Sequence, residues 1–381
     1  MKRILFVETG SGFGGSAKYL YELLSRLDKG RFESYVIYSG DGSYLQKIKT
    51  KGIPCHQLKL SLASPRRPII SYLYLFFWFI FSAFPNAIRI FSFIKRNKID
   101  LIYLNNELLT HFPSIIAGKF SGAKIVCHNH GLRQLTFLEK RFVPFVDLFI
   151  CVSEASRAAI KDAIGGKPIK VVLNGLDIRD YDLNAIILAA EIQKIKQKNK
   201  IVGMVGRIVE WKGHENFVEA AARVLKLNKN VFFILVGDDL NQDKVFLNRL
   251  KNRISDLGIG NNFIFTGWKE DIRPYVFGFD VYVHPSIEPE PFGLTVIEAM
   301  ALGKPVVASR LGALSEIIED GKDGYLYEPK NTDHMVEKIS RLLLDEQLRQ
   351  TLGQHAREKV AASFTIENNV QQVQEIIDAQ F

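Results

Sequence analysis

The sequence predicts an α/β protein made of two Rossmann-like domains, and three observations support that fold class. Short apolar runs that suit buried parallel strands alternate with helical patterns through the first half of the chain. A second series of the same kind opens at 201–205. The length of 381 residues suits two domains of common size, each with an ample core.

The strands are expected where short apolar runs lie between turn residues. The first run, 4–7, leads into a glycine-rich loop and then into a helix over about 17–27, which is the order of a Rossmann-like opening. Further strands are expected at 35–38, 101–104, 124–127, 148–152 and 169–173 in the first half, and at 201–205, 232–236, 263–265 and 281–284 in the second.

The glycine-rich loop from Thr9 to Ser16 brings the backbone close to a ligand, but it is no clean dinucleotide fingerprint. Its glycines fit Gly-x-Gly-x-x-Gly when read from Gly10, yet no acidic residue closes a second strand about 20 residues later. Glu33 precedes the expected second strand instead of ending it. A Rossmann oxidoreductase is therefore disfavoured, and a plain tight turn is the other interpretation of the loop.

Composition and charge limit the function classes. With 47% hydrophobic and 24% charged residues, the chain is neither disordered nor a polytopic membrane protein. Residues 1–180 carry 26 Lys and Arg against 13 Asp and Glu, so the first half is expected to face an anionic partner. Charge alone leaves nucleic acid, anionic lipid and phosphorylated substrate open. Three cysteines without CxxC spacing favour a reducing compartment, and the N-terminal residues predict a first strand, not a signal peptide.

The segment 69–88 is unusual because its twenty residues contain no Asp, Glu, Lys or Arg. A helix of that length could span a bilayer, but the strands before and after it must share one sheet, so we do not expect a span. Aromatic residues within it and basic residues around it, over 66–98, predict peripheral attachment to an anionic membrane surface. Burial in the core or against a protein partner is the alternative.

The stretch 284–304 predicts a site for an anion and for hydroxyl groups. Glu290 and Glu298 flank Pro-Phe-Gly-Leu-Thr, which is the pattern of a helix start. The backbone amides from Phe292 to Thr295 then lack helical acceptors and suit a phosphate. The two carboxylates suit sugar hydroxyls, so the stretch predicts a nucleotide-sugar pocket.

Glu290 and Glu298, together with the following Ala-Met-Ala-x-Gly-Lys-Pro-Val-Val-Ala-Ser, resemble glycosyltransferase family 4, whose members are retaining enzymes of the GT-B fold. The resemblance is strong over 200–330 and thinner over 1–180. It implies two Rossmann-like domains that face each other across a cleft, the second binding a nucleotide-diphosphate sugar and the first binding the acceptor.

The resemblance also implies a domain plan. We expect an acceptor-binding domain over 1–180, a linker over 181–199, and a nucleotide-sugar-binding domain over 200–364. The final segment, 365–381, is expected to form a helix that packs back on the first domain.

Candidate site residues follow from the matching positions. Arg207 and Lys212 are expected to clamp the diphosphate and to stabilise the charge that grows as it leaves. Glu298 is expected on the ribose, and Glu290 on the sugar ring. Catalysis is therefore assigned to Glu290, Arg207, Lys212 and His130, and donor binding to Glu298, Phe292, Gly293, Leu294, Thr295 and Gly206.

In the first half, His130 comes just after an expected strand end and resembles the family histidine that contacts the donor sugar, whereas His128 is expected to point into the fold. Gly14 and Gly15 resemble the loop opposite the donor phosphates. No metal site is expected, because Asp238 and Asp239 do not form an Asp-x-Asp pattern.

These expectations describe a retaining hexosyl-type glycosyltransferase that uses a UDP-sugar or similar donor without metal or other cofactor. The expected acceptor is a polyprenyl-diphosphate-linked glycan in polysaccharide assembly, at the cytoplasmic face of the cell membrane, and no nucleic acid partner is expected. Two alternatives stay open: a soluble glycosyltransferase acting on free sugars or small metabolites, and a non-catalytic sugar- or membrane-binding subunit.

Overall fold

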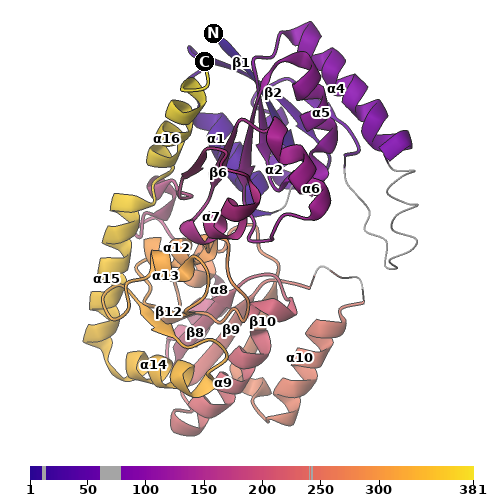
Figure 1. Ribbon diagram of the computed structural model, residues 1–381. Coiled ribbons are helices and arrows are strands. Elements are labelled where there is room, and N and C mark those ends of the chain that lie inside the picture. Colours follow the sequence, from indigo (N-terminus) through magenta and orange to yellow (C-terminus); the bar gives the residue numbers. More distant parts are fainter. Residues whose placement is uncertain (11–13, 61–78, 240, 242) are drawn as a thin grey trace. The chain divides into compact units, whose positions relative to one another are not determined.

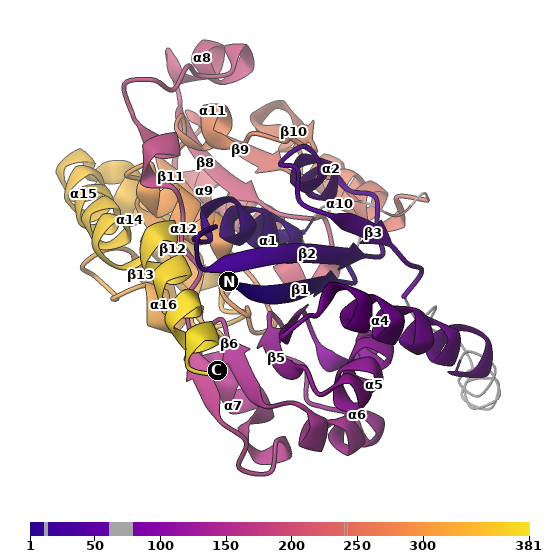
Figure 2. The same cartoon turned by 90° about the horizontal axis from the view of Figure 1, so that it is seen from above.

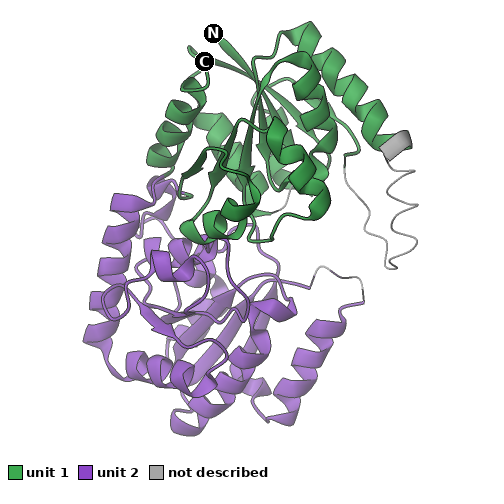
Figure 3. Cartoon of the chain, in the orientation of Figure 1, with its two compact units in different colours: residues 1–174, 366–381 green, residues 175–365 purple. Residues whose placement is uncertain are grey.

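The chain forms two compact units, each built on its own parallel sheet (Figure 3). The computed structural model describes residues 1–10, 14–60, 79–239, 241 and 243–381. Unit 1 comprises Met1–Asn174 together with Ile366–Phe381, and unit 2 comprises Gly175–Thr365. Figure 1 shows helices covering the sheet in both units.

Unit 1 contains a seven-stranded parallel sheet in the order β3-β2-β1-β4-β5-β6-β7. The chain runs outward from β1 through β2 to β3 and then restarts on the other side of β1 at β4, so the order of the strands reverses between β1 and β4. Such a reversal opens a crevice at the carboxyl ends of the strands, where open α/β sheets bind ligands. The strands are β1 (Lys2–Glu8), β2 (Phe32–Tyr38), β3 (Cys55–Gln57), β4 (Leu101–Asn105), β5 (Lys124–Asn129), β6 (Leu148–Cys151) and β7 (Ile169–Val171).

Apolar side chains on both faces of this sheet form the core of unit 1. Neighbouring residues of one strand, such as Phe6 and Val7, belong to different apolar clusters, because successive strand side chains point to opposite faces of the sheet. Figure 2 shows α1 on one side of β1 and β2, and α4 and α5 on the other. The helices of unit 1 are α1 (Gly15–Arg26), α2 (Ser43–Lys49), α4 (Phe84–Asn97), α5 (Phe112–Ser121), α6 (Phe137–Phe142), α7 (Glu154–Ile160) and α16 (Ile366–Asp378), with short turns η1 (Phe79–Ala83), η2 (Leu108–Thr110), η3 (Val143–Phe145) and η4 (Lys161–Ala163).

The C-terminal helix α16 belongs to unit 1 although it follows unit 2 in the chain. Val370 and Val373 are buried in the same cluster as residues of α1 and of the sheet. The side-chain amide of Asn369 donates to the carbonyl of Leu173 at 2.7 Å. The helix thus completes one face of the first sheet.

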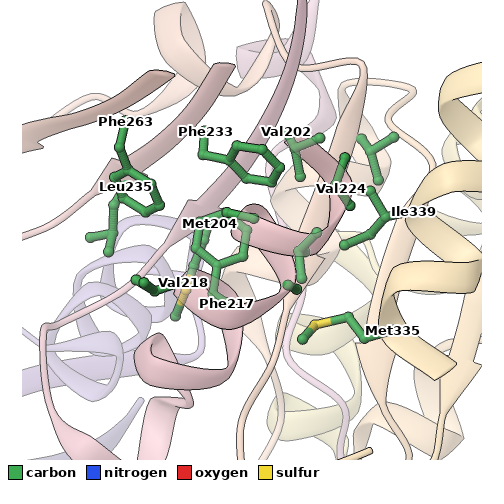
Figure 4. Packing of buried hydrophobic residues seen from close by; sticks show 14 of the residues in the cluster. Val202, Met204, Phe217, Val218, Val224, Phe233, Leu235, Phe263, Met335 and Ile339 are labelled. Atoms are coloured by element: carbon green, nitrogen blue, oxygen red, sulfur yellow. The ribbon is translucent and has the colours of Figure 1, made fainter. Parts of the chain in front are cut away.

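Unit 2 contains a six-stranded parallel sheet in the order β10-β9-β8-β11-β12-β13, which reverses between β8 and β11. Figure 4 shows its core, in which Phe217 of α9 packs edge-on against Phe233 of β9 with ring centroids 5.7 Å apart. The strands are β8 (Lys200–Val205), β9 (Val231–Val236), β10 (Phe263–Gly267), β11 (Val281–His284), β12 (Val306–Ser309) and β13 (Tyr325–Tyr327).

The remaining elements of unit 2 surround that sheet. Its helices are α8 (Ala190–Lys196), α9 (His214–Leu227), α10 (Val245–Asp256), α11 (Arg273–Val276), α12 (Leu294–Ala301), α13 (Leu314–Ile317), α14 (Thr332–Leu344) and α15 (Glu346–Ser363), with short turns η5 (Ile178–Tyr181), η6 (Glu210–Lys212) and η7 (Gly260–Asn262).

The segment 181–199, which the sequence predicts as a linker, falls within unit 2, and Tyr181 and Ile192 are its buried residues. Unit 2 begins at Gly175, and Ile192 of α8 is fully buried. A methyl group at Gly278 would lie 2.1 Å from the Ile192 Cγ2 atom, and Lys196 Nζ donates to the Gly278 carbonyl at 2.9 Å. The polar composition of this segment reflects one exposed face of α8, while its isoleucine packs inward.

The first half of the apolar segment at 69–88 lies outside the described residues, which resume at Phe79. In the part that follows, Phe84 and Ile88 of α4 are 54% and 52% exposed. Arg89, Lys95 and Arg96 on the same helix are also exposed. Among the described helices, none has both the length and the apolar composition needed to cross a membrane.

Candidate functional site

The centre of the site in unit 2 is the carboxylate of Glu290, which is only 4% exposed. Its Oε1 atom accepts hydrogen bonds from three side chains: His284 Nε2 at 2.8 Å, Ser286 Oγ at 2.7 Å and Lys212 Nζ at 2.5 Å. His284 ends β11, and Lys212 lies in the loop that follows β8. Since β8 and β11 are neighbours at the reversal of the sheet, the two loops meet at its carboxyl edge.

The charge state of Glu290 follows from these partners. Burial alone would raise the pKa of the Glu290 carboxyl, but the positive charge of Lys212 and the hydrogen bonds from His284 and Lys212 outweigh burial and hold that pKa below its ordinary value. Burial lowers the pKa of His284, against the opposing effect of Glu290. The arrangement is therefore an ionised carboxylate with a lysine ammonium and a neutral imidazole that donates through Nε2.

Two glycines let backbone segments approach this carboxylate. Gly213 has φ of 75°, and a Cβ atom there would lie 1.8 Å from the carbonyl oxygen of Pro285. Gly312 has φ of 58°, and a Cβ atom there would lie 2.4 Å from the Glu290 carbonyl oxygen, to which the amide of Ala313 donates at 3.0 Å. Only glycine combines this backbone conformation with such close approach.

Helix α12 carries the second carboxylate, that of Glu298, which is 6% exposed. The hydroxyl of Tyr181 donates to Glu298 Oε1 at 3.2 Å. Nearby, the Tyr282 hydroxyl donates to Thr295 Oγ1 at 2.8 Å. Burial raises the pKa of Tyr282, and the charges of Glu298 and Glu290 raise it further, so both carboxylates lie within electrostatic range of this hydroxyl.

The start of α12 lies in the stretch for which the sequence predicts phosphate-binding backbone amides. The helix begins at Leu294 with Gly293 at its N-cap, and no side chain caps it, so its first amides point away from any helical acceptor. The side chain of Phe292 is buried and packs against Phe364, with ring centroids 6.1 Å apart. Phe292 therefore belongs to the core and could reach a ligand only through its backbone.

Lys212 and Arg207, the two basic residues that the sequence predicts for the site, lie in different surroundings. Lys212 is held against Glu290, and its Cδ atom lies 3.8 Å from where a Cβ atom of Gly206 would be. Arg207 follows β8 on the same edge of the sheet, but its side chain is exposed, and the described contacts pair it with no carboxylate. Arg207 is thus available to an anion at this edge, while Lys212 is engaged.

Unit 1 holds a second polar network at the reversal of its own sheet. Glu8, at the end of β1, is paired in register with Asn105, at the end of β4. The Asn105 side-chain amide donates to Glu8 Oε2, and its Oδ1 atom lies 3.0 Å from His130 Nε2. His128 is buried, as predicted, with its Nδ1 atom 2.6 Å from the Tyr103 hydroxyl. Gly14 is the N-cap of α1, and Gly15 is its first residue.

Sequence reasoning found Glu290, Glu298 and Lys212 but missed several of their partners. His284 and Ser286 could have been noticed because they are polar residues at the end of a buried strand and just after it, ahead of Glu290. No signal in the sequence indicates Tyr181, which lies 117 residues from Glu298. Glu8 and Asn105 each lie one residue beyond an expected strand, and no role was predicted for either.

Metal ligation is a separate question. The described residues contain no cluster of three or more His, Cys, Asp or Glu side chains that could hold a metal ion. Chemically, the edge of unit 2 offers an exposed guanidinium and free helix-start amides for an anion, with two carboxylates for hydroxyl groups.

Both halves of the chain match models of glycosyltransferase families. Residues 188–359 match the family model described as glycosyl transferases group 1, and residues 13–180 match the model described as glycosyltransferase family 4. The chain is 30% identical over 293 residues to the N-acetyl-alpha-D-glucosaminyl L-malate synthase of Bacillus anthracis, covering 74% of this chain and 75% of that protein.

Two further proteins are similar to this chain over most of its length. The UDP-Gal:alpha-D-GlcNAc-diphosphoundecaprenol alpha-1,3-galactosyltransferase of Escherichia coli is 24% identical over 310 residues, which are 76% of this chain and 78% of that protein. The crystal structure of Anabaena HepE in complex with UDP-glucose superposes over the whole of both chains with a TM-score of 0.82 and 26% identity.

Proposed function

Because the chain belongs to glycosyltransferase family 4 and has the GT-B fold, we propose that it transfers a hexosyl group, with retention, from a UDP-sugar to a polyprenyl-diphosphate-linked glycan. The observation that carries this proposal is the buried, ionised Glu290 carboxylate beside Lys212, at the edge of the sheet where α12 begins. The complex of HepE with UDP-glucose supports a UDP-sugar as the donor.

The proposed mechanism relies on positioning and electrostatics. The amides at the start of α12, with Lys212 and Arg207, stabilise the diphosphate as its bond to the anomeric carbon breaks. Glu290 accepts hydrogen bonds from the sugar hydroxyls, and Glu298 from those of the ribose. The acceptor oxygen bonds to the anomeric carbon on the face that the diphosphate leaves, and its proton passes to a phosphate oxygen.

No side chain acts as a nucleophile in this proposal, and no metal takes part. Glu290 is an unsuitable nucleophile because three donors already share its Oε1 atom and keep the carboxylate weakly basic. Lys212 supplies the positive charge that a metal ion would otherwise bring to the diphosphate.

The lipid-linked acceptor is supported by two observations. The Escherichia coli relative acts, by its name, on a diphosphoundecaprenol-linked sugar. In unit 1, α4 exposes Phe84 and Ile88 together with the basic side chains of Arg89, Lys95 and Arg96, which suits attachment to an anionic bilayer surface. We place the protein at the cytoplasmic face of the membrane, where nucleotide sugars and free thiols occur together.

The test uses the purified full chain with a panel of UDP-hexoses and a short-chain polyprenyl-diphosphate sugar. We expect one donor to be used, the anomeric configuration of the product to match that of the donor by NMR, and the rate to survive EDTA. An inverted product, or loss of the rate in EDTA with recovery on adding Mg²⁺, would contradict the mechanism. Equal rates with a free sugar acceptor would contradict the lipid-linked acceptor.

A small-molecule acceptor is the second candidate function. It is favoured by the 30% identity to the Bacillus anthracis relative, whose name describes synthesis of a glucosaminyl malate. Adding L-malate and free sugars to the same assay separates the two candidates, because only a small-molecule enzyme would use them at rates that do not depend on the lipid.

A further inference from the structure

Glu8 is a carboxylate without a cationic partner in the described part of the chain. It is fully buried at the carboxyl end of β1. Its Oε1 atom accepts from the backbone amide of Gly10 at 2.6 Å and from Asn106 Nδ2 at 3.3 Å, and its Oε2 atom accepts from Asn105 Nδ2. A Cβ atom at Gly10 would lie 2.7 Å from Glu8 Oε1, so the turn closes directly over the carboxylate.

The partners of Asn105 fix which way its side-chain amide faces. Its Nδ2 atom donates to the Glu8 carboxylate and, at 3.1 Å, to the carbonyl oxygen of Ser16. An ionised carboxylate and a carbonyl are both acceptors only, so the NH₂ group must face them. The Oδ1 atom is then left facing His130 Nε2 at 3.0 Å.

The His130 ring must direct an N–H group at Asn105 Oδ1. Burial lowers the pKa of His130 to about 3, so its imidazole is neutral at working pH and carries a single N–H. Because Asn105 Oδ1 can only accept, that hydrogen lies on Nε2, and Nδ1 keeps its lone pair. The ring packs against Tyr19 and His128, with centroids 5.0 and 4.3 Å away, and stays partly exposed.

We propose that Glu8 and Asn105 are positioning residues that hold His130 in its Nε2–H tautomer, so that His130 Nδ1 accepts a hydrogen bond from a hydroxyl group of the sugar substrate. The recognised group is a hydroxyl and not a phosphate oxygen, because a neutral nitrogen with a lone pair repels an acceptor. This inference rests on the proposed transferase function, but its first test does not depend on activity.

The first test measures the tautomer of His130 in the unmodified full chain by NMR of ¹⁵N-labelled histidine. The spectrum is taken at about pH 8.5, above the Glu8 pKa of about 7, so that the carboxylate is ionised. His130 is assigned by comparison with the His130→Asn variant. We expect a protonated Nε2 and an unprotonated Nδ1, and the reverse would overturn the proposal.

The second test replaces Glu8 by glutamine. With its oxygen toward Gly10, the new side chain presents an NH₂ group to the NH₂ group of Asn105, so one of the two acceptors that orient the Asn105 amide is lost and only the Ser16 carbonyl still holds it. The Glu8→Gln variant should therefore shift His130 partly toward the Nδ1–H tautomer and lower kcat by up to about tenfold, the full loss of one substrate hydrogen bond. The affinity for UDP, which unit 2 determines, should not change.

The control for this variant is Glu33→Gln, which removes a carboxylate on the neighbouring strand β2 from a half-buried ion pair with Arg3 of β1. It should leave both the tautomer and kcat as they are. If Glu8→Gln folds, as judged by circular dichroism, and keeps the Nε2–H tautomer with an unchanged kcat, the proposal is wrong. If it does not fold, the spectrum of the unmodified protein decides.

Discussion

Lys212 Nζ lies 2.5 Å from Glu290 Oε1, although 78 residues separate them in the chain. Both side chains are largely buried, at 14% and 5% exposure. A buried carboxylate of this kind depends on its cation, because removing one partner leaves an uncompensated charge in a poorly solvated place. The first prediction follows from this pair.

Replacing Lys212 by methionine should remove both catalysis and stability. We expect a loss of about a hundredfold or more in kcat and of about 3 kcal/mol in the free energy of unfolding. The measurements are a steady-state transfer assay and denaturant unfolding. Lys244→Met is the control, since Lys244 pairs with Asp238 at the surface, and both quantities should stay nearly unchanged.

The same variant should change how stability depends on pH. The folded-state pKa of Glu290 lies below its unfolded value, so this group contributes stability above the unfolded pKa and loses it as pH falls toward the folded pKa. Without Lys212 the effect of burial prevails and the folded pKa rises. The Lys212→Met variant should then lack this acid loss of stability, so that lowering the pH below the unfolded pKa of Glu290 destabilises the variant less than the unmodified protein, and parallel pH profiles would contradict this account.

Gly213→Ala should disturb the site through the backbone. Gly213 and Gly258 both have positive φ, of 75° and 66°. A Cβ atom at Gly213 would lie 1.8 Å from the Pro285 carbonyl oxygen, whereas one at Gly258 would meet nothing within 4 Å. Gly258→Ala should therefore cost only about 1–2 kcal/mol of unfolding free energy. Gly213→Ala should cost more and also reduce kcat, because it displaces Lys212. Equal effects in calorimetry and assay would count against the prediction.

Tyr181→Phe should weaken the binding of the nucleotide. The lost hydroxyl donates to Glu298 Oε1 at 3.2 Å and helps to hold that carboxylate in place. We expect the Kd for UDP, measured by calorimetry, to rise about fivefold to tenfold, as for the loss of one hydrogen bond. Tyr327→Phe, at a buried tyrosine on β13, is the matched control and should keep the original Kd.

Glu8 should make the protein less stable as pH rises, which is the opposite of the usual behaviour of a carboxylate. Burial raises the pKa of Glu8 from 4.5 to about 7, so the folded state binds a proton more tightly than the unfolded state. The corresponding stability is fully present below pH 4.5 and is lost as pH rises through about 7. The loss is on the order of 3 kcal/mol.

The neighbouring titratable groups do not obscure this change. Burial lowers the pKa values of His128 and His130 and raises that of Tyr19, so all three stay neutral in the folded protein, and the titration of the histidines in the unfolded state is the same for both proteins and cancels in their difference. Urea unfolding at several pH values should show Glu8→Gln gaining stability relative to the unmodified protein between pH 5 and pH 8, roughly the interval between the two pKa values. A constant difference between the two proteins would show that Glu8 is not the group responsible.

The exposed face of α4 should determine binding to lipid. Replacing both Phe84 and Ile88 by serine removes two exposed apolar side chains without touching the buried side of the helix. We expect binding to anionic vesicles, measured by sedimentation, to fall about tenfold or more. The control is the double variant Leu227→Ser and Leu344→Ser, which removes exposed leucines from unit 2 and should bind vesicles normally. Equal loss of binding in both double variants would contradict a specific role for α4.

Part of this protein could be predicted from the sequence because the signals are local. Apolar runs of strand length between turn residues marked each strand of the second sheet except the short β12 and β13, and most of those in the first. Glu290, Gly293 and Glu298 lie within one loop and one helix, so their spacing does not depend on how the rest of the chain is arranged. Lys212 could be placed because it follows a strand by a few residues.

Only the tertiary structure decided how these groups are connected. The order of strands in each sheet brings Lys212 to Glu290, and Glu8 to Asn105, across 78 and 97 residues, and the sequence states no such order. Ile192 packs against Gly278, and the polar segment 181–199 around it belongs to unit 2. The physical reason is that burial, charge and hydrogen bonding act together: Lys212 and His284 keep the buried Glu290 ionised and burial raises the pKa of Glu8, and both effects depend on neighbours that are distant in the chain.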